Sequence, residues 1–176
     1  EKPMQQAIKA GAKLMINING SPYHINKIQE RQEIIKQRIN ESLMPIIYVN
    51  QVGAQDELVF DGASMAFDQF GKLCAMGPLY EEAMLPIDCV VNADGEISVE
   101  ESEIFPLPST QESIYQALVL GLRDYVNKNG FPGIVLGLSG GIDSALTLAI
   151  AVDALGAQRV QAVMMPYAYT SEMSLE

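Results

Sequence analysis

A chain of 176 residues, of which 48% are hydrophobic and 19% charged, can bury the core of one domain or two small ones and is too apolar to be disordered. Its formal net charge is −11, and residues 78–122 contain nine acidic residues with no Lys or Arg, so we expect neither a nucleic acid nor an anionic membrane as a partner. No apolar run reaches the roughly 18 residues that a membrane span needs, and no leader pattern opens the sequence, which together predict a cytoplasmic protein.

The first part of the chain is predicted to alternate between helix and strand. Its longer helix is amphipathic, and we expect the basic residues Lys27, Arg31 and Arg38 to lie away from the buried face. The continuously apolar run 46–50 is typical of a strand that is buried on both faces. A turn cluster over 19–23 follows the first strand, at the strand end where open α/β folds place ligands. The predicted elements are a helix over 3–10, a strand over 13–19, a helix over about 26–42 and a strand over 46–50.

The middle of the chain changes to an apolar period of two. Residues 57–75 are predicted to form an antiparallel hairpin, and a further strand is expected over 85–91. The acidic segment 96–108, which holds two prolines, is predicted to be a solvated linker at a domain boundary. Cys74 and Cys89 lie in apolar contexts that favour reduced, buried thiols.

The last part predicts one βαβ unit, the beginning of a doubly wound parallel sheet. Ser109 and Glu112 have the spacing of a capping box, and the helix that they open is expected to end at Asn129 and Gly130. The unit itself is predicted as a strand over 134–138, a glycine turn, a helix over 144–155 and a strand over 160–165.

The glycine turn, residues 137–144 with the sequence GLSGGIDS, carries the chemistry of this unit and is called the glycine loop below. Paired glycines let backbone N–H groups approach a ligand closely, and the helix start behind them favours an anion such as phosphate. No lysine follows the second glycine, so the loop is not the common P-loop. A carboxylate at Asp143 would repel phosphate unless a divalent cation lies between them, which predicts a metal ion at this loop.

The run Ser139 to Ser144 resembles the SGGxDS signature of the ATP pyrophosphatases, which adenylate a carbonyl or carboxylate group and release pyrophosphate. Met165, Pro166 and Tyr167, with the run 169–172, resemble the NAD synthetase branch of that group. The resemblance implies that ATP binds at the glycine loop and that Asp143 holds Mg²⁺. The implied ATP-binding residues are Gly137, Leu138, Ser139, Gly140, Gly141, Ile142, Asp143 and Ser144.

The runs 19–27 and 48–62 resemble the C-terminal half of the nitrilase-type glutaminase domain that is fused ahead of such synthetases. This resemblance implies that Ser21 and Lys27 contact the substrate glutamine. The Cys, Glu and Lys that catalyse hydrolysis in these glutaminases would lie upstream of Glu1, so no residue of this chain is expected to be catalytic. Two motifs from two domains, in the right order, point to the glutamine-dependent NAD synthetase family.

The predicted fold is therefore α/β: part of a nitrilase-like α-β-β-α sandwich over 1–95, a linker over 96–108, and the start of a Rossmann-like PP-loop domain over 109–176. The resemblance implies a carbon–nitrogen ligase that amidates deamido-NAD with ATP and ammonia from glutamine. It further implies small-molecule partners and a homo-oligomer. Two alternatives stay open, namely another PP-loop adenylating amidotransferase or tRNA-modifying enzyme, and a non-catalytic nucleotide-binding module.

Overall fold

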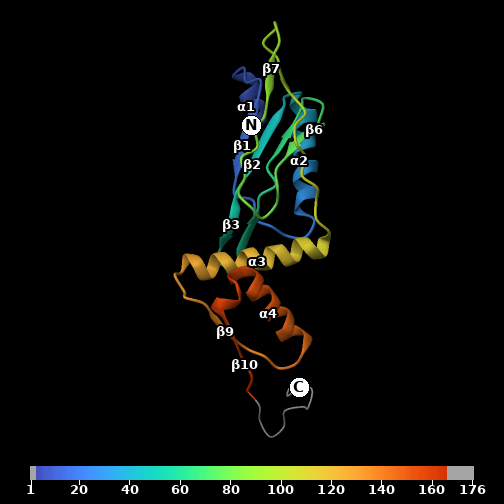
Figure 1. Cartoon of the computed structure of the whole chain (residues 1–176). Coiled ribbons are helices and arrows are strands. Elements are labelled where there is room, and N and C mark those ends of the chain that lie inside the picture. The colour runs from blue at the N-terminus through green and yellow to red at the C-terminus, as the bar shows by residue number, and fades with distance from the viewer. Residues whose placement is uncertain (1–2, 166–176) are drawn as a thin grey trace. The chain divides into compact units, whose positions relative to one another are not determined.

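The computed structural model describes residues 3–165, which form a mixed α/β structure (Figure 1). The chain divides into two compact units, one made of residues 1–53 and 60–109 and the other of residues 54–59 and 110–176. The prediction of an α/β protein is confirmed. Within the described residues, no helix is both long enough and apolar enough to cross a membrane.

The first unit is built on a mixed four-stranded sheet in the order β1-β2-β5-β6. Strands β1 and β2 are parallel, with Met15 opposite Ile46 and Asn19 opposite Asn50, so their carboxyl ends lie together. The pairs β2–β5 and β5–β6 are antiparallel, and the second confirms the predicted hairpin from residue 65 onward. Residues 58–61, expected in the same hairpin, pair instead with residues 52–55. The strands are β1 (Met15–Asn19), β2 (Ile46–Asn50), β5 (Met65–Phe67) and β6 (Leu73–Met76).

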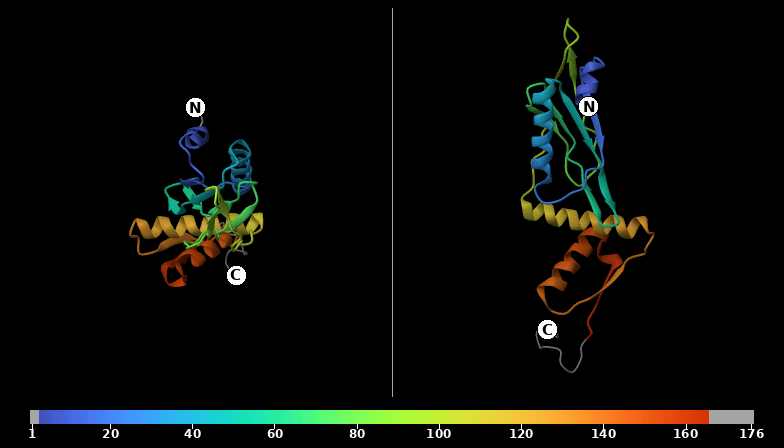
Figure 2. Two further views of the ribbon diagram at one scale, coloured as in Figure 1. Left: turned by 90° about the horizontal axis from the view of Figure 1, so that it is seen from above. Right: turned by 180° about the vertical axis from the view of Figure 1, so that it is seen from behind.

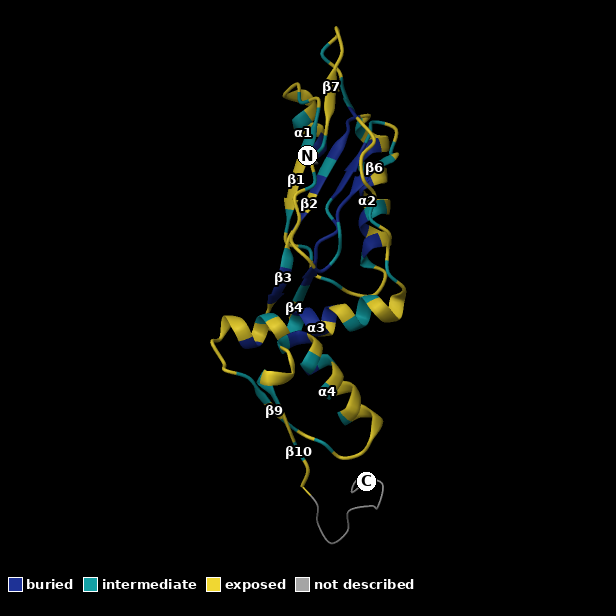
Figure 3. Ribbon diagram, in the orientation of Figure 1, coloured by how far each residue is buried: buried dark blue, intermediate teal, exposed yellow. Residues whose placement is uncertain are grey.

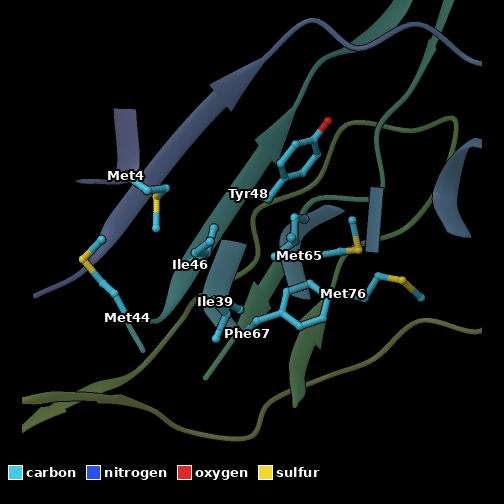
Figure 4. Close-up of a cluster of buried hydrophobic side chains, with 9 residues drawn as sticks. Met4, Ile39, Met44, Ile46, Tyr48, Met65, Phe67 and Met76 are labelled. Atoms are coloured by element: carbon cyan, nitrogen blue, oxygen red, sulfur yellow. The ribbon is translucent and has the colours of Figure 1, made fainter. Parts of the chain in front are cut away.

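Two helices, α1 (Pro3–Lys9) and α2 (Lys27–Ser42), cover one face of this sheet (Figure 2). The core between helices and sheet is apolar and rich in methionine (Figure 4), because β2 and β5 direct alternate side chains toward the helices. Strand β2 is fully buried on the side of the helices, whereas on its other face Ile47 is half-buried and Val49 exposed, so the prediction of a strand buried on both faces is wrong at Val49. The cluster comprises Met4, Ile35, Ile39, Met44, Ile46, Tyr48, Met65, Phe67 and Met76.

The opposite face of the sheet is covered by the segment that follows β6. Its hairpin of β7 (Cys89–Val91) and β8 (Ile97–Val99) places Val99 in a second core cluster with Ala66, Cys74 and Ala75. Further along, the N–H of Ser102 donates to the carbonyl of Cys74 and that of Phe105 to the carbonyl of Met76. The segment 96–108 is thus packed against the sheet, which corrects the expectation of a solvated linker. Its glutamates remain exposed. Strand β7 of the same hairpin has the yellow of exposed residues in Figure 3.

The two cysteines differ in burial. Cys74 is buried and Cys89 exposed, and both are free thiols. The expectation of a reduced, buried thiol is therefore confirmed for Cys74 but wrong for Cys89, because β7 exposes all three of its residues. Burial raises the pKa of the Cys74 thiol, which makes it a weak nucleophile at neutral pH.

The second unit contains the predicted βαβ arrangement. Strands β9 and β10 are parallel, with Val160 opposite Ile134, and α4 connects them. The hydroxyl of Tyr115 on α3 donates to the Asp153 carboxylate on α4 over 2.6 Å. The elements of the unit are α3 (Thr110–Lys128), β9 (Ile134–Gly137), α4 (Ile142–Leu155), the 3-10 turn η1 (Ala157–Arg159) and β10 (Val160–Val163). Two short strands, β3 (Val52–Gln55) and β4 (Leu58–Asp61), pair with each other, and each has residues in both units.

Candidate functional site

The glycine loop leaves β9 and enters α4 in the second unit. Helix α4 begins at Ile142, two residues earlier than predicted, so Asp143 and Ser144 lie in its first turn. Gly140 has φ +74°, a left-handed conformation that glycine adopts without the strain of a side chain. The predicted residues thus follow the strand–turn–helix path that presents backbone N–H groups to an anion.

Two serine hydroxyls tie the glycine loop together. The N–H of Ser139 donates to Ser144 Oγ over 3.2 Å, and the two hydroxyl oxygens are also 3.2 Å apart. Ser144 Oγ in turn donates to the carbonyl of Gly141 over 2.9 Å. These contacts are exposed, and the hydroxyls are within reach of a ligand at the loop. The serines of the signature therefore shape the loop by hydrogen bonds within it.

Asp143 is the residue of this loop that could hold a metal ion. Its side chain is exposed in the first turn of α4, and the backbone carbonyl of Asp143 accepts a hydrogen bond from Thr147 Oγ1. The described residues contain no group of three or more His, Cys, Asp or Glu that could bind a metal without further ligands. A single carboxylate suits Mg²⁺, which commonly takes one or two carboxylates and completes its shell with phosphate oxygens and water.

The Ser21 loop, residues 19–24, follows β1 in the first unit. Asn50 at the end of β2 holds Ser21 by a reciprocal pair of hydrogen bonds: Ser21 N–H donates to Asn50 Oδ1 over 3.0 Å, and Asn50 Nδ2 donates to the Ser21 carbonyl over 3.3 Å. The same Nδ2 also donates to the carbonyl of Gly62 over 3.0 Å. The parallel pairing of β1 with β2 explains this contact, because it brings both strand ends to one edge.

Arg31 of α2 is the residue of this site that sequence reasoning missed. It was expected away from the buried face, yet its side chain is only 3% exposed and pairs with Asp61, which is fully buried. Arg31 Nη2 and Nη1 donate to the Asp61 carboxylate over 2.8 and 3.0 Å. The signal that could have placed it is its spacing, because Arg31 lies three residues after Ile28 and four before Ile35, on the apolar stripe of α2.

Arg31 also binds the Ser21 loop directly. Its Nη2 donates to the carbonyl of Ser21 over 2.8 Å and to that of Pro22 over 3.2 Å, and its Nε donates to Ser21 Oγ over 3.2 Å. A single guanidinium therefore joins the loop to Asp61, using the fork of donors that distinguishes arginine from lysine.

Lys27, the second residue expected at this loop, begins α2 and pairs with Glu30. Its Nζ donates to the Glu30 carboxylate over 2.9 Å, and this hydrogen bond holds the pKa of Glu30 below its ordinary value. Residues four apart share a helix face, so Lys27 stands one turn before Arg31 on the side of α2 that the Ser21 loop contacts.

Fold and sites together define an α/β protein that combines a polar loop at the edge of one sheet with a glycine-rich strand-to-helix loop in a βαβ unit. Residues 114–176 match the NAD synthase family. Over 98% of its length the chain is 40% identical to the glutamine-dependent NAD(+) synthetase of Aquifex aeolicus and 42% identical to that of Acinetobacter baylyi. It is also similar to the structure of a glutamine-dependent NAD+ synthetase from Acinetobacter baumannii in complex with adenosine diphosphate, with a TM-score of 0.88, 45% identity, and coverage of 97% of this chain and 32% of that one.

The chain is therefore homologous to the glutamine-dependent NAD(+) synthetases along nearly all of its length. It spans about a third of the length of the curated relatives that it matches. The expected resemblance to this family is confirmed. Pro166, Tyr167 and the run 169–172, which carried part of the resemblance, lie outside the described residues.

Proposed function

We propose that this chain is part of a glutamine-dependent NAD(+) synthetase, in which residues 109–176 help to bind and activate the nucleotide substrates and residues 1–95 help to bind glutamine. The observation that carries the proposal is the glycine loop, which joins a parallel strand to α4 with Asp143 in the first turn. Homology along nearly the whole chain and the ADP named in the Acinetobacter baumannii complex support a nucleotide at this loop.

At the glycine loop, backbone N–H groups and the hydroxyls of Ser139 and Ser144 bind the phosphates of ATP. A carboxylate oxygen of deamido-NAD attacks the α-phosphorus and the bond to pyrophosphate breaks, which gives an acyl adenylate. Ammonia then attacks the acyl carbon, loses a proton, and displaces AMP as the amide forms. When bound through Asp143, Mg²⁺ neutralises phosphate charge; the chain's own residues supply position and hydrogen bonds.

At the Ser21 loop, the hydroxyl of Ser21 and the ammonium group of Lys27 bind glutamine. Lys27 can shift between Glu30 and a substrate carboxylate, since a lysine ammonium acts as a flexible point charge. Hydrolysis of glutamine is assigned to no described residue of this chain. The partners that the proposal implies are small molecules, with self-association into a homo-oligomer and no nucleic acid or membrane.

The test is to measure release of AMP and formation of NAD by the full-length protein, with glutamine and separately with ammonia. We expect both nitrogen donors to support deamido-NAD-dependent release of AMP. Ser21→Ala should impair the glutamine reaction and leave the ammonia reaction intact. Absence of deamido-NAD-dependent AMP from either donor would refute the proposal and favour another adenylating enzyme or a nucleotide-binding module. Equal loss with both donors in Ser21→Ala would remove Ser21 from the glutamine site.

A further inference from the structure

Two polar side chains bind Ser21, Arg31 from α2 and Asn50 from β2, and a third, Asp61 from β4, binds Arg31. All are more than nine-tenths buried, with exposed fractions of 4%, 6% and 0%. We propose that Arg31, Asn50 and Asp61 are positioning residues for glutamine, which act by fixing the backbone and the hydroxyl of Ser21. The inference rests on the proposed role of Ser21 in binding glutamine.

The hydrogen bonds around Ser21 determine whether its hydroxyl acts as a donor or an acceptor toward a ligand. Ser21 N–H is bound by Asn50 Oδ1, and its carbonyl accepts from both Asn50 Nδ2 and Arg31 Nη2. A guanidinium can only donate, so Ser21 Oγ accepts from Arg31 Nε and keeps its own hydrogen for another acceptor. An oriented O–H donor suits a carboxylate or carbonyl oxygen of an amino acid. Arg31 thereby turns a hydroxyl that could donate or accept into a donor toward the ligand.

Asp61 makes this arrangement possible. Burying a guanidinium without a partner would lower the stability of the fold. The bidentate pair with Asp61 compensates the charge of Arg31 and fixes the plane of its guanidinium. Because Asp61 binds Nη1 and Nη2 of Arg31, the orientation of the guanidinium is fixed, and its Nε and Nη2 donate to the Ser21 loop. Asp61 thus acts on Ser21 through Arg31.

The backbone beside Asp61 is strained and reaches the same loop a second time. Ala63 and Tyr80 have φ +52° and +62°, and Tyr80 N–H donates to the Asp61 carbonyl over 3.1 Å. The ring of Tyr80 packs edge-on against that of Tyr23, with centroids 6.0 Å apart. Left-handed conformations at residues other than glycine persist where the surroundings impose them, often at functional sites. The Ser21 loop is therefore held at both Ser21 and Tyr23.

The test uses the full-length protein and two variants, neither of which leaves a buried charge at position 31 or 61 without a partner of opposite charge. Arg31→Met/Asp61→Leu removes both charges, so neither is left unpaired, and Arg31→Lys keeps the charge next to Asp61 but loses the Nε donor. We expect the double variant to raise KM for glutamine by about tenfold or more, with a smaller change in kcat, because it removes hydrogen bonds from a charged group. Arg31→Lys should raise the same KM, and ammonia-dependent formation of NAD should stay unchanged in both.

A cycle with Ser21→Ala separates positioning from a purely structural role. If Arg31 acts through the Ser21 hydroxyl, Arg31→Lys should raise KM less in the Ser21→Ala background than in the wild type, because only its bonds to the backbone carbonyls remain to be lost. The matched control is Arg38→Met on the same helix, which removes an arginine paired with Glu41 at the surface and should leave KM for glutamine unchanged.

The outcomes are distinct. Unchanged KM for glutamine in an active Arg31→Lys enzyme, or additive effects with Ser21→Ala, would overturn the inference alone. Parallel loss of the glutamine and ammonia reactions in both Arg31 variants would also overturn it, because it would show general damage to the fold. A wild-type protein that forms no NAD from either donor would refute the proposed function, and the inference with it.

Discussion

The Ser21 loop and the glycine loop both follow the carboxyl end of a strand, but they are stabilised by opposite means. Ser21 is held by Arg31 and Asn50, which are buried and come from other elements. The glycine loop is held by Ser139 and Ser144, which belong to the loop itself and are bonded at the exposed surface. The first loop depends on tertiary structure that exists before a ligand arrives, whereas the second depends on local geometry that a ligand can complete.

This difference suggests how each loop recognises its ligand. A preorganised hydroxyl with a fixed direction suits selection of one small amino acid, because an incorrect ligand would leave the donor unpaired. A set of backbone N–H groups on a helix terminus suits a phosphate chain, whose many equivalent oxygens require charge compensation more than direction. Variants at the two loops should therefore differ in which reaction they impair and in how much stability they cost.

The largest effect on activity is expected at Asp143. Asp143→Asn preserves the shape of the side chain but removes the charge that would hold Mg²⁺, so adenylation should fall by at least about a hundredfold with either glutamine or ammonia. Release of AMP measured with each donor tests this. Asp153→Asn, on the same helix but bonded to Tyr115, is the matched control and should retain activity. A loss confined to the glutamine reaction would break the assignment of the two loops to two reactions.

The largest effect on stability is expected at Asp61. Asp61→Ala leaves Arg31 buried without its partner, which should lower the free energy of unfolding by about 3–5 kcal/mol. Thermal or denaturant unfolding of the full-length protein, followed at the transition of the first unit, measures this change. Glu41→Ala, which removes the partner of Arg38 at the surface, should change stability little. Similar losses of unfolding free energy for both variants would mean that the buried Arg31–Asp61 pair contributes no more to stability than a surface ion pair.

The two loops also differ in how far sequence could predict them. The sequence predicts the path of the glycine loop except for the start of α4 at Ile142, because strand, glycines, Asp143 and helix are consecutive and each acts locally. At the Ser21 loop the sequence indicates Ser21 and Lys27, but Asn50 is 29 positions beyond Ser21 and meets it only through the pairing of β1 with β2. Asp61 is 40 positions beyond Ser21 and acts on it only through Arg31. Arg31 was misplaced because a charged residue was expected to face solvent, although its helical spacing matched the buried stripe. Long-range pairing likewise explains why the segment 96–108 packs against β6.

A smaller effect, at Gly140, tests whether the glycine loop depends on local geometry. Gly140 has φ +74° and Gly156, at the other end of α4, has φ +79°, so alanine should strain the backbone at both by about 1–2 kcal/mol. If strain alone mattered, the two variants would behave alike. We expect instead that the exposed loop relaxes in free Gly140→Ala and takes the strained conformation only when ATP binds, so that 1.4 kcal/mol of strain raises KM for ATP by roughly tenfold, whereas Gly156→Ala affects only stability. Unfolding curves should then show the larger destabilisation for Gly156→Ala, and steady-state kinetics should show the larger KM for ATP in Gly140→Ala. Equal KM for ATP in the two variants would mean that the conformation of Gly140 does not shape the nucleotide site. The backbone N–H groups of the glycine loop would then bind ATP equally well from another backbone conformation.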